Sequence, residues 1–367
     1  MPWRQNLASL GNRCMNSVRQ PFRLLDASAS SAQPKIAVFR AMHLGELLCT
    51  VPTLRALRAA MPNAHVTLIG LPWAASFARR FSGYIDAHVD FPGFPGLPGQ
   101  SVDLPRIPSF IAAMQEQRFD CVLQIHGSGG LSNPLVRTFG AVRNAGFYRQ
   151  GEYCPDPLHF MPWDENCHDI LRLAQLMTFL GVPPASHELE FPVTEADRQA
   201  LLASLPKPPA AGSYVCIHPG ARLPAQRWPA ADFARVADRL HAAGLQVLLV
   251  GSAQEATLAA TVQRDMRMPA LNLAGKLGVG AFAALLEQAR LVVCNDTGIA
   301  HIAAALGIPS VALCYGSGLR RWAPLDRRRH RSVHVVTEDA AGQPGLVRER
   351  VLATVRALLE DTGMPLA

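Results

Sequence analysis

Residues 291–316, LVVCNDTGIAHIAAALGIPSVALCYG, decide the fold. The apolar run 291–294 predicts a buried strand, and residues 295–298 turn the chain. Residues 299–306 have the spacing of a helix, and a second apolar run at 310–315 predicts the next strand. A strand, a turn, a helix and a strand in this order are typical of an α/β protein with a parallel sheet.

The turn of this segment carries groups that suit a nucleotide sugar. Asp296, Thr297 and Gly298 stand where the helix begins, and free N–H groups and the helix dipole favour an anion such as a diphosphate there. Asp296 repels phosphate, so its better role is to accept hydrogen bonds from sugar hydroxyls beside the phosphates. The alternative is a capped helix with His301 as a histidine of the core.

Composition limits the class of protein. The chain has 367 residues, enough for two domains, and 49% of them are hydrophobic, so a large core can form. The net charge of +7 suits acidic partners, namely nucleotide phosphates, nucleic acid or an anionic membrane surface. Aromatic residues make up only 7% and do not alternate with basic ones, whereas single-strand binding needs stacking platforms. We therefore expect no nucleic-acid partner.

The cysteines and the first residues bear on location. The eight cysteines form no CxxC pair and most lie in apolar runs, which indicates small buried side chains in a reducing, cytoplasmic compartment. No apolar stretch reaches the ~18 residues that span a bilayer. Residues 1–34 carry four arginines against one acid, which predicts a mobile basic arm. An amphipathic membrane contact of this arm is the alternative.

The rest of the chain predicts two series of alternating strands and helices, as in Rossmann-like domains. A Pro-rich stretch at 206–212 separates residues 35–205 from residues 213–345, and residues 346–367 form a terminal helix and tail. No GxGxxG follows the first strand, which argues against a nicotinamide oxidoreductase. The expected strands are 36–39, 66–69, 86–91, 120–125, 214–217, 246–250, 270–273, 291–294, 310–315 and 333–336. The expected helices are 46–61, 73–80, 108–117, 164–180, 195–205, 230–243, 253–265, 279–289, 299–306 and 346–359.

Three segments at strand-to-loop transitions carry a resemblance to a known family. They are 36–58, IAVFRAMHLGELLCTVPTLRALR; 216–229, CIHPGARLPAQRWP; and 291–316. Their order and spacing resemble glycosyltransferase family 9, the ADP-heptose:lipopolysaccharide heptosyltransferases, from Lys35 to the last helix. The resemblance implies the GT-B fold, in which two Rossmann-like domains face each other across a cleft. It also implies an acceptor site in the N-terminal domain, an ADP-sugar donor in the C-terminal domain, inversion at the anomeric carbon and no essential metal.

The resemblance assigns the general base to an acidic residue in a Leu-Gly-Asp triplet after the first strand. The triplet here is Leu44-Gly45-Glu46, so Glu46 takes that role, with a carboxylate shifted by about 1 Å through its extra methylene. An alternative is that Glu46 only compensates the helix dipole. His43 is the second candidate base, because its ordinary pKa of about 6.5 suits neutral pH.

The resemblance also assigns the donor site. The position of the family's phosphate-binding lysine is Gln226, which is neutral, so either phosphate is held less strongly or Arg222 or Arg227 supplies the charge. Of the two arginines Arg222 is favoured, because it lies on the loop directly after the strand. Arg227 is alternatively a solvated residue, and His218 either packs or contacts the ligand. The remaining donor residues are Glu255 for the nucleoside, Asp296 for sugar hydroxyls, Thr297 and Gly298 for the diphosphate, and His301 facing the same cleft. Glu255 is alternatively an ordinary acidic residue in the first turn of a helix.

The acceptor site is harder to read. The family's acceptors are anionic inner-core lipopolysaccharide sugars, and the N-terminal half is locally basic, as such an acceptor requires. We assign Arg55, Arg58 and His126 to acceptor binding, although a solvated face is the default for any surface arginine.

These observations predict an inverting glycosyltransferase that moves a heptose from ADP-heptose to a lipopolysaccharide core acceptor. It would be cytoplasmic, with a peripheral contact at the inner face of the cytoplasmic membrane, and would use no cofactor besides the ADP-sugar substrate. One alternative is a related transferase for another nucleotide sugar or acceptor, as in capsule, secondary-metabolite or protein glycosylation. The other is a non-catalytic protein that binds a nucleotide sugar.

Overall fold

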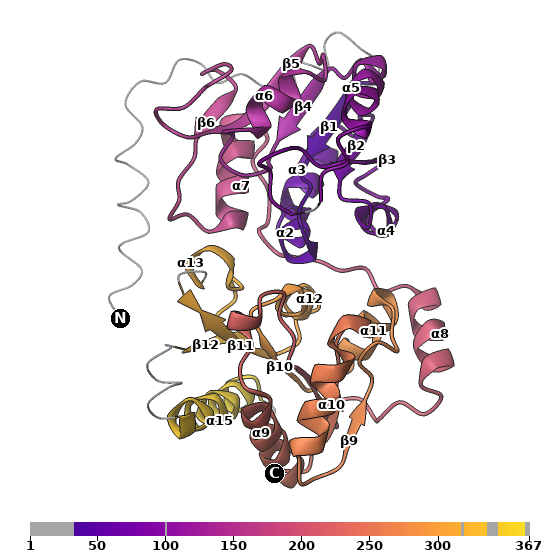
Figure 1. The fold of residues 1–367 in the computed structure, drawn as a ribbon, viewed down its shortest axis with the longest axis vertical. Coiled ribbons are helices and arrows are strands. Elements are labelled where there is room, and N and C mark those ends of the chain that lie inside the picture. The colour runs from indigo at the N-terminus through magenta and orange to yellow at the C-terminus, as the bar shows by residue number, and fades with distance from the viewer. Residues whose placement is uncertain (1–32, 100, 317–318, 336–343, 364–367) are drawn as a thin grey trace. The chain divides into compact units, whose positions relative to one another are not determined.

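The computed structural model describes residues 33–99, 101–316, 319–335 and 344–363. They form two units, each built on a six-stranded parallel sheet (Figure 1). Within the described residues, unit 1 takes the chain up to Ala41, Thr53–Trp163 and Leu173–Ala185. Unit 2 takes Met42–Pro52, Asp164–Arg172 and the chain from Ser186 onward.

The sheet of unit 1 has the strand order β3-β2-β1-β4-β5-β6, which is the Rossmann order. Val38 in the central strand pairs with Leu68 on one side and Leu123 on the other. A core of phenylalanines that meet edge to face packs on the sheet: Phe39, Phe91, Phe110 and Phe139. The strands are β1 (Lys35–Phe39), β2 (His65–Gly70), β3 (Ala87–Asp90), β4 (Cys121–Gln124), β5 (Arg143–Tyr148) and β6 (Phe160–Pro162). The helices are α3 (Val51–Ala60), α4 (Ala74–Arg80), α5 (Arg106–Gln117), α6 (Ser132–Arg137) and α7 (Asp169–Phe179).

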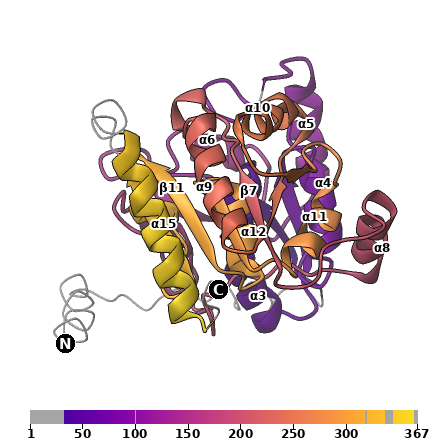
Figure 2. The same ribbon diagram turned by 90° about the horizontal axis from the view of Figure 1, so that it is seen from below.

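The sheet of unit 2 repeats this topology, with the order β12-β11-β10-β7-β8-β9. Helices α9 and α15 lie side by side and pack on each other through buried aliphatic side chains (Figure 2). The strands are β7 (Tyr214–His218), β8 (Gln246–Leu249), β9 (Ala270–Asn272), β10 (Leu291–Asn295), β11 (Ser310–Tyr315) and β12 (His330–Val335). The helices are α2 (Leu44–Leu48), α8 (Glu195–Ser204), α9 (Ala230–Ala242), α10 (Ala256–Asp265), α11 (Val279–Leu286), α12 (Gly298–Ala305), α13 (Leu319–Trp322) and α15 (Pro344–Asp361).

The predicted α/β class with two Rossmann-like halves is confirmed. The helix expected at 46–61 is instead two helices, α2 and α3, with a break at Cys49 and Thr50. Pro52 explains the break: it has no N–H to bond to Leu48, and its ring would clash with that carbonyl in a continuous helix. The helix expected at 164–180 begins only at Asp169.

The structure divides the chain differently from the boundary predicted at 206–212. Helix α8, expected to end the first domain, packs on α11 in unit 2, where Arg198 pairs with Glu287 at 2.9 Å. Two segments from the first half, Met42–Pro52 and Asp164–Arg172, also belong to unit 2. The predicted arm at 1–34 lies almost entirely outside the described residues. None of the helices that the structure describes has the length and apolar character needed to cross a membrane.

Candidate functional site

The strand order of unit 2 reverses between β7 and β10. From β7 the chain continues to β8 on one side, and from β10 it continues to β11 on the other. Open α/β sheets bind ligands outside the carboxyl ends of the strands at such a switch point. Here β7 ends at His218 and β10 ends at Asn295, so the loops after these two residues define the candidate site.

Asn295 fixes the shape of the loop after β7. Its fully buried amide accepts a hydrogen bond from the Trp228 backbone at 3.1 Å and donates to the carbonyls of Pro219 and Gly220 at 2.8 and 3.2 Å. Trp228 is buried against Phe233, with ring centroids 5.1 Å apart. Sequence reasoning assigned no role to Asn295, although a polar residue that closes an apolar strand is a usable signal.

Helix α12 begins directly after β10, and the side chain of its N-cap residue, Thr297, makes no capping bond. Thr297 stands at the N-cap in an extended conformation, but its hydroxyl donates to the carbonyl of Asn295 at 3.2 Å. The same hydroxyl lies 3.5 Å from Nδ1 of His218. The first backbone N–H groups of the helix, from Gly298 onward, can therefore donate to an anion.

Glu255 ends a short 3-10 helix after β8 (Ala253–Glu255), and His218 links it to Thr297 at the start of α12. Its Oε2 accepts hydrogen bonds from the backbone N–H and the hydroxyl of Ser252, both at 2.8 Å, and from Nε2 of His218 at 3.2 Å. Burial alone would raise the pKa of Glu255, but the bonds from His218 and Ser252 lower it to about 2. The carboxylate is therefore ionised at neutral pH.

Glu46 is brought to the same region, because α2 packs against α12 within unit 2. A Cβ at Gly45 would lie only 2.7 Å from Cδ2 of His301, so a glycine is needed for this contact. Burial raises the pKa of Asp296, and the negative charge of Glu46 raises it further, against a hydrogen bond from Cys314. Glu46, Asp296 and His301 thus share one site although about 250 residues separate the first from the others.

His301 is buried and neutral. Burial lowers its pKa to about 4, although Glu46 and Asp169 attract a proton. Asp169 belongs to the segment Asp164–Arg172, and it forms a buried ion pair with Arg172 at 3.0 Å. Sequence reasoning missed this segment, because nothing local shows that it leaves its own half of the chain.

The other predicted donor residues take different positions. Arg222 and Gln226 are exposed on the loop after β7, with Gln226 in a short 3-10 turn. The Nε of Arg227 donates to the carbonyl of Ala221 at 2.8 Å, so this side chain closes its own loop. His43 stands at the N-cap of α2 and makes no capping bond. Its Nε2 is buried and has no hydrogen-bond partner in the part of the chain that the structure describes.

The predicted acceptor residues lie in unit 1. Arg58 donates to the carbonyls of Ala64 and Tyr84 and pairs with Asp86 at 2.6 Å, so its guanidinium holds unit 1 together, contrary to a role in binding the acceptor. Arg55 is half-buried on α3. His126 lies just beyond β4, at the switch point of this sheet.

His126 carries a buried hydrogen-bond donor on its ring. Its Nδ1 accepts the N–H of Ala41 at 3.2 Å, and burial together with the positive charge of Arg40 lowers its pKa to about 4. A neutral ring that accepts at Nδ1 carries its proton on Nε2. That Nε2–H has no acceptor among the described residues. No three histidine, cysteine or acidic side chains within the described ranges are grouped so that they could hold a metal ion.

The comparison with family models decides the classification. Residues 107–348, well over half of the chain, match the model of glycosyltransferase family 9 (heptosyltransferase). The chain belongs to glycosyltransferase family 9. The family that the three sequence segments predicted is therefore confirmed.

Individual family 9 proteins support this placement. The lipooligosaccharide heptosyltransferase 2 of Haemophilus influenzae is 36% identical over 29% of this chain and 32% of that protein. The lipopolysaccharide heptosyltransferase 2 of Salmonella typhimurium is 30% identical over 40% of this chain and 47% of that protein. The alignments thus span about a third to a half of these curated relatives. The structure of the Escherichia coli ADP-heptose LPS heptosyltransferase II gives a TM-score of 0.71 at 22% identity, covering 90% of this chain and 99% of that chain. The family 9 fold, of GT-B type, is therefore the fold of this protein.

Proposed function

We propose that this protein transfers a heptose from ADP-heptose to an anionic sugar of a lipopolysaccharide core, with inversion and without a metal cofactor. The observation that carries the proposal is the meeting of Glu46, Asp296 and His301 at the uncapped N-terminus of α12. This arrangement offers a carboxylate base, an acceptor for sugar hydroxyls and N–H donors for a diphosphate. The relatives are heptosyltransferases by name, and one of them is named for ADP-heptose.

In the proposed reaction, Glu46 removes the proton of the attacking acceptor hydroxyl. The hydroxyl oxygen forms a bond to the anomeric carbon as the bond from that carbon to the diphosphate oxygen breaks. The electron pair of the broken bond leaves with ADP. Backbone N–H groups at the start of α12 stabilise the charge that develops on the diphosphate. Asp296 orients the heptose by accepting hydrogen bonds from its hydroxyls.

Arg222 supplies the cation that Gln226 lacks. Its side chain is exposed on the loop after β7, whereas Arg227 is already bonded to Ala221. A guanidinium can bind a phosphate through two parallel hydrogen bonds. Glu255 binds the nucleoside, since its ionised carboxylate can accept hydrogen bonds from ribose hydroxyls.

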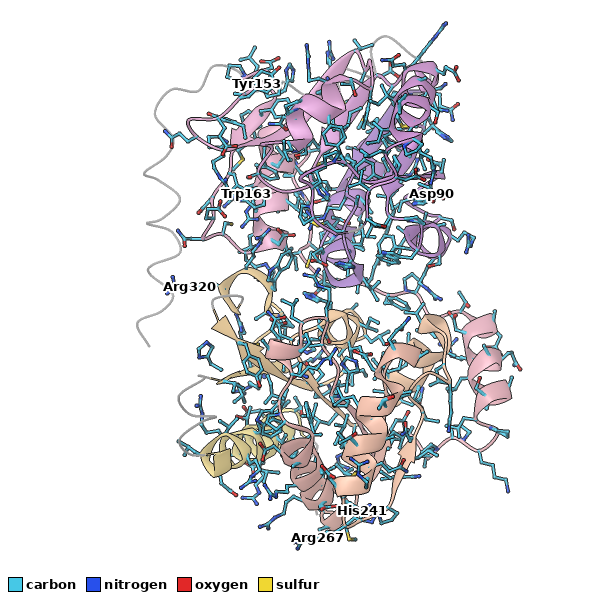
Figure 3. All side chains as sticks on the ribbon, in the orientation of Figure 1. Asp90, Tyr153, Trp163, His241, Arg267 and Arg320 are labelled. Carbon is cyan, nitrogen blue, oxygen red and sulfur yellow. The ribbon has the colours of Figure 1, made fainter. Side chains whose placement is uncertain are left out.

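The acceptor binds unit 1 through His126. Its buried Nε2–H needs an acceptor atom, and a sugar oxygen or carboxylate of the core provides one. Arg55 would add positive charge on α3. Because the core acceptor is attached to lipid, we place the reaction at the cytoplasmic face of the membrane. Exposed Arg320 on α13 is one of the residues available for peripheral contact with anionic lipid (Figure 3).

The test is to incubate the protein with ADP-heptose and a heptose-free core acceptor, and to measure ADP release and the mass of the product. ADP release coupled to a product heavier by one heptose is expected. Binding of ADP-heptose without turnover would overturn the enzymatic proposal in favour of a nucleotide-sugar-binding protein, the candidate that the neutral Gln226 favours. Turnover only with another nucleotide sugar would contradict the proposed donor.

A further inference from the structure

One buried side chain links three loops of unit 2. His218, which is 4% exposed at the end of β7, contacts Glu255 after β8 through Nε2 and Thr297 after β10 through Nδ1. These loops come from the three neighbouring strands at the switch point of the sheet. The imidazole therefore stands between the carboxylate proposed for the nucleoside and the helix terminus proposed for the diphosphate.

The two oxygens of Glu255 differ in their surroundings. Oε2 accepts all three hydrogen bonds, two from Ser252 and one from His218. Oε1 receives no hydrogen bond from the residues that the structure describes, so it keeps its capacity to accept from a ligand hydroxyl. Ser252 and His218 together hold Oε2 and leave Oε1 as the oxygen that can still accept.

Two glycines, Gly220 and Gly251, lie against the carboxylate of Glu255. A Cβ at Gly220 would lie 1.8 Å from Oε1 of Glu255 and 2.8 Å from Nε2 of His218. A Cβ at Gly251 would lie 3.2 Å from Oε2. The carboxylate therefore lies directly against two loop backbones; a side chain at Gly220 would clash with it, and one at Gly251 would force it to shift slightly.

The contact with Glu255 shows which nitrogen of the His218 ring carries a proton. An ionised carboxylate only accepts, so Nε2 of His218 must carry a proton. The hydroxyl of Thr297 lies 3.5 Å from Nδ1 and gives its single proton to the carbonyl of Asn295, so its oxygen is the atom that faces the ring. The ring orientation and the Thr297 rotamer are thus set together.

We propose that His218 is a positioning residue that couples binding of the nucleoside sugar at Glu255 to binding of the diphosphate at the start of α12. The inference rests on the proposed function, because it takes a nucleoside diphosphate as the ligand. It adds a role for a residue that touches neither the reacting carbon nor its leaving oxygen. His218 acts through Oε1 of Glu255, which accepts from ribose hydroxyls, and through Thr297.

Two substitutions separate the two links. In His218→Gln the side-chain amide reaches the place of Nε2 and can still donate to Glu255. In His218→Asn the amide reaches only the place of Nδ1, so the link to Glu255 is lost. The dissociation constants of ADP and of adenosine are measured by titration calorimetry for both variants and the wild type, together with Tm.

We expect His218→Asn to raise the Kd of both ligands about tenfold, the scale of one hydrogen bond to a charged group. His218→Gln should keep the Kd of adenosine within about threefold, since that bond is retained. Gly220→Ala, which keeps the histidine but displaces Oε1 and crowds the imidazole, should weaken adenosine like His218→Asn. Arg267→Gln is the matched control, because Arg267 is exposed at the opposite end of unit 2 from α12 (Figure 3).

Equal losses in His218→Gln and His218→Asn, in step with a fall in Tm, would show a purely structural histidine and overturn the inference. Wild-type affinity in His218→Asn would overturn it as well. The proposed function fails in a different way. A wild type that binds ADP with the expected pattern among the variants, yet transfers no heptose, supports the role of His218 and contradicts the transferase.

Discussion

The two units share a strand order but use their switch points differently. Each has a buried histidine there, His126 beyond β4 in unit 1 and His218 at the end of β7 in unit 2. In unit 2 both ring nitrogens lie beside polar partners, and one partner is the ionised Glu255. In unit 1 the Nε2–H has no acceptor among the described residues. One scaffold therefore carries a histidine with polar neighbours at both ring nitrogens and a histidine whose N–H has no partner among the described residues.

The loops account for this difference. After β10 the chain enters the eight-residue helix α12, whose N-terminus is uncapped and faces no charged side chain of its own first turn. After β4 it passes through a glycine-containing loop, in which Gly129 lies against Asn133 and Phe147, before the shorter helix α6. Unit 2 therefore suits a diphosphate, and unit 1 suits a group that accepts a single buried hydrogen bond.

The largest effect should come from the base. Glu46→Gln keeps the shape of the side chain but cannot take a proton, so kcat should fall by ~10²–10⁴ while the Kd of ADP stays nearly constant. Steady-state rates and calorimetry measure the two quantities. His43→Gln is the companion variant. If His43→Gln lowers kcat by ~10²–10⁴ and Glu46→Gln leaves kcat at the wild-type value, the base is His43 and not Glu46.

The next effect tests the donor side of the comparison. Asp296→Ala removes the acceptor of sugar hydroxyls, and we expect the Kd of ADP-heptose to rise about a hundredfold, the scale of two hydrogen bonds to a charged group. The Kd of ADP, which has no heptose, should change little. A wild-type Kd for ADP-heptose would mean that the heptose binds elsewhere.

The acceptor side should show a smaller effect. His126→Phe removes the Nε2–H while keeping a flat ring beside Phe39, whose centroid lies 5.0 Å away. The KM for the core acceptor should rise about tenfold, the scale of one buried hydrogen bond, with the Kd of ADP unchanged. An unchanged acceptor KM together with a weakened ADP Kd would reverse our assignment of the two units.

The smallest effect concerns stability and pH. Burial holds the pKa of His126 in unit 1, and of His301 and His330 in unit 2, at about 4. Between these values and about 6.5 the unfolded chain binds more protons than the folded one, so stability should fall as the pH drops through this window. Thermal melting from pH 7 to pH 4 measures it. His126→Phe should reduce the slope by about one proton, and an unreduced slope would show that His126 is not buried neutral.

Much of the fold could be predicted because its strands are short apolar runs followed by polar loops. The strand β10 and the loop after it were readable in this way, and so were the neighbouring strands of unit 2. Strand β5, Arg143–Tyr148, was missed because RNAGFY has no apolar run. Residue 146 in this strand has to be a glycine, because a Cβ there would lie 2.4 Å from the carbonyl oxygen of Gln124 on the neighbouring strand β4. Such a contact between strands leaves no local signal.

Prediction of the candidate site from the sequence has the same limit, because contacts between distant residues leave no local pattern. Sequence spacing placed Asp296 and Thr297 on the loop after β10 and Glu255 in the first turn of the helix that follows β8, and in the structure Glu255 ends a short 3-10 helix there. It could not tell that Arg58 is occupied by carbonyls and by Asp86, because those partners come from other elements of unit 1. Nor could it show that Asp169 would act on the pKa of His301. Both facts depend on contacts between distant parts of the chain.

The segment Met42–Pro52 has a consequence for making chimaeras. It lies in the first half of the sequence but packs in unit 2, where Gly45 contacts His301. An exchange of sequence halves between relatives at residues 206–212 would therefore bring a foreign α2, with the carboxylate that we propose as the base, against the recipient's α12. A chimaera would then acquire the acceptor preference of the other relative only if the contacting residues of α2 and α12 were exchanged together. The two sequence halves therefore cannot be exchanged independently of each other.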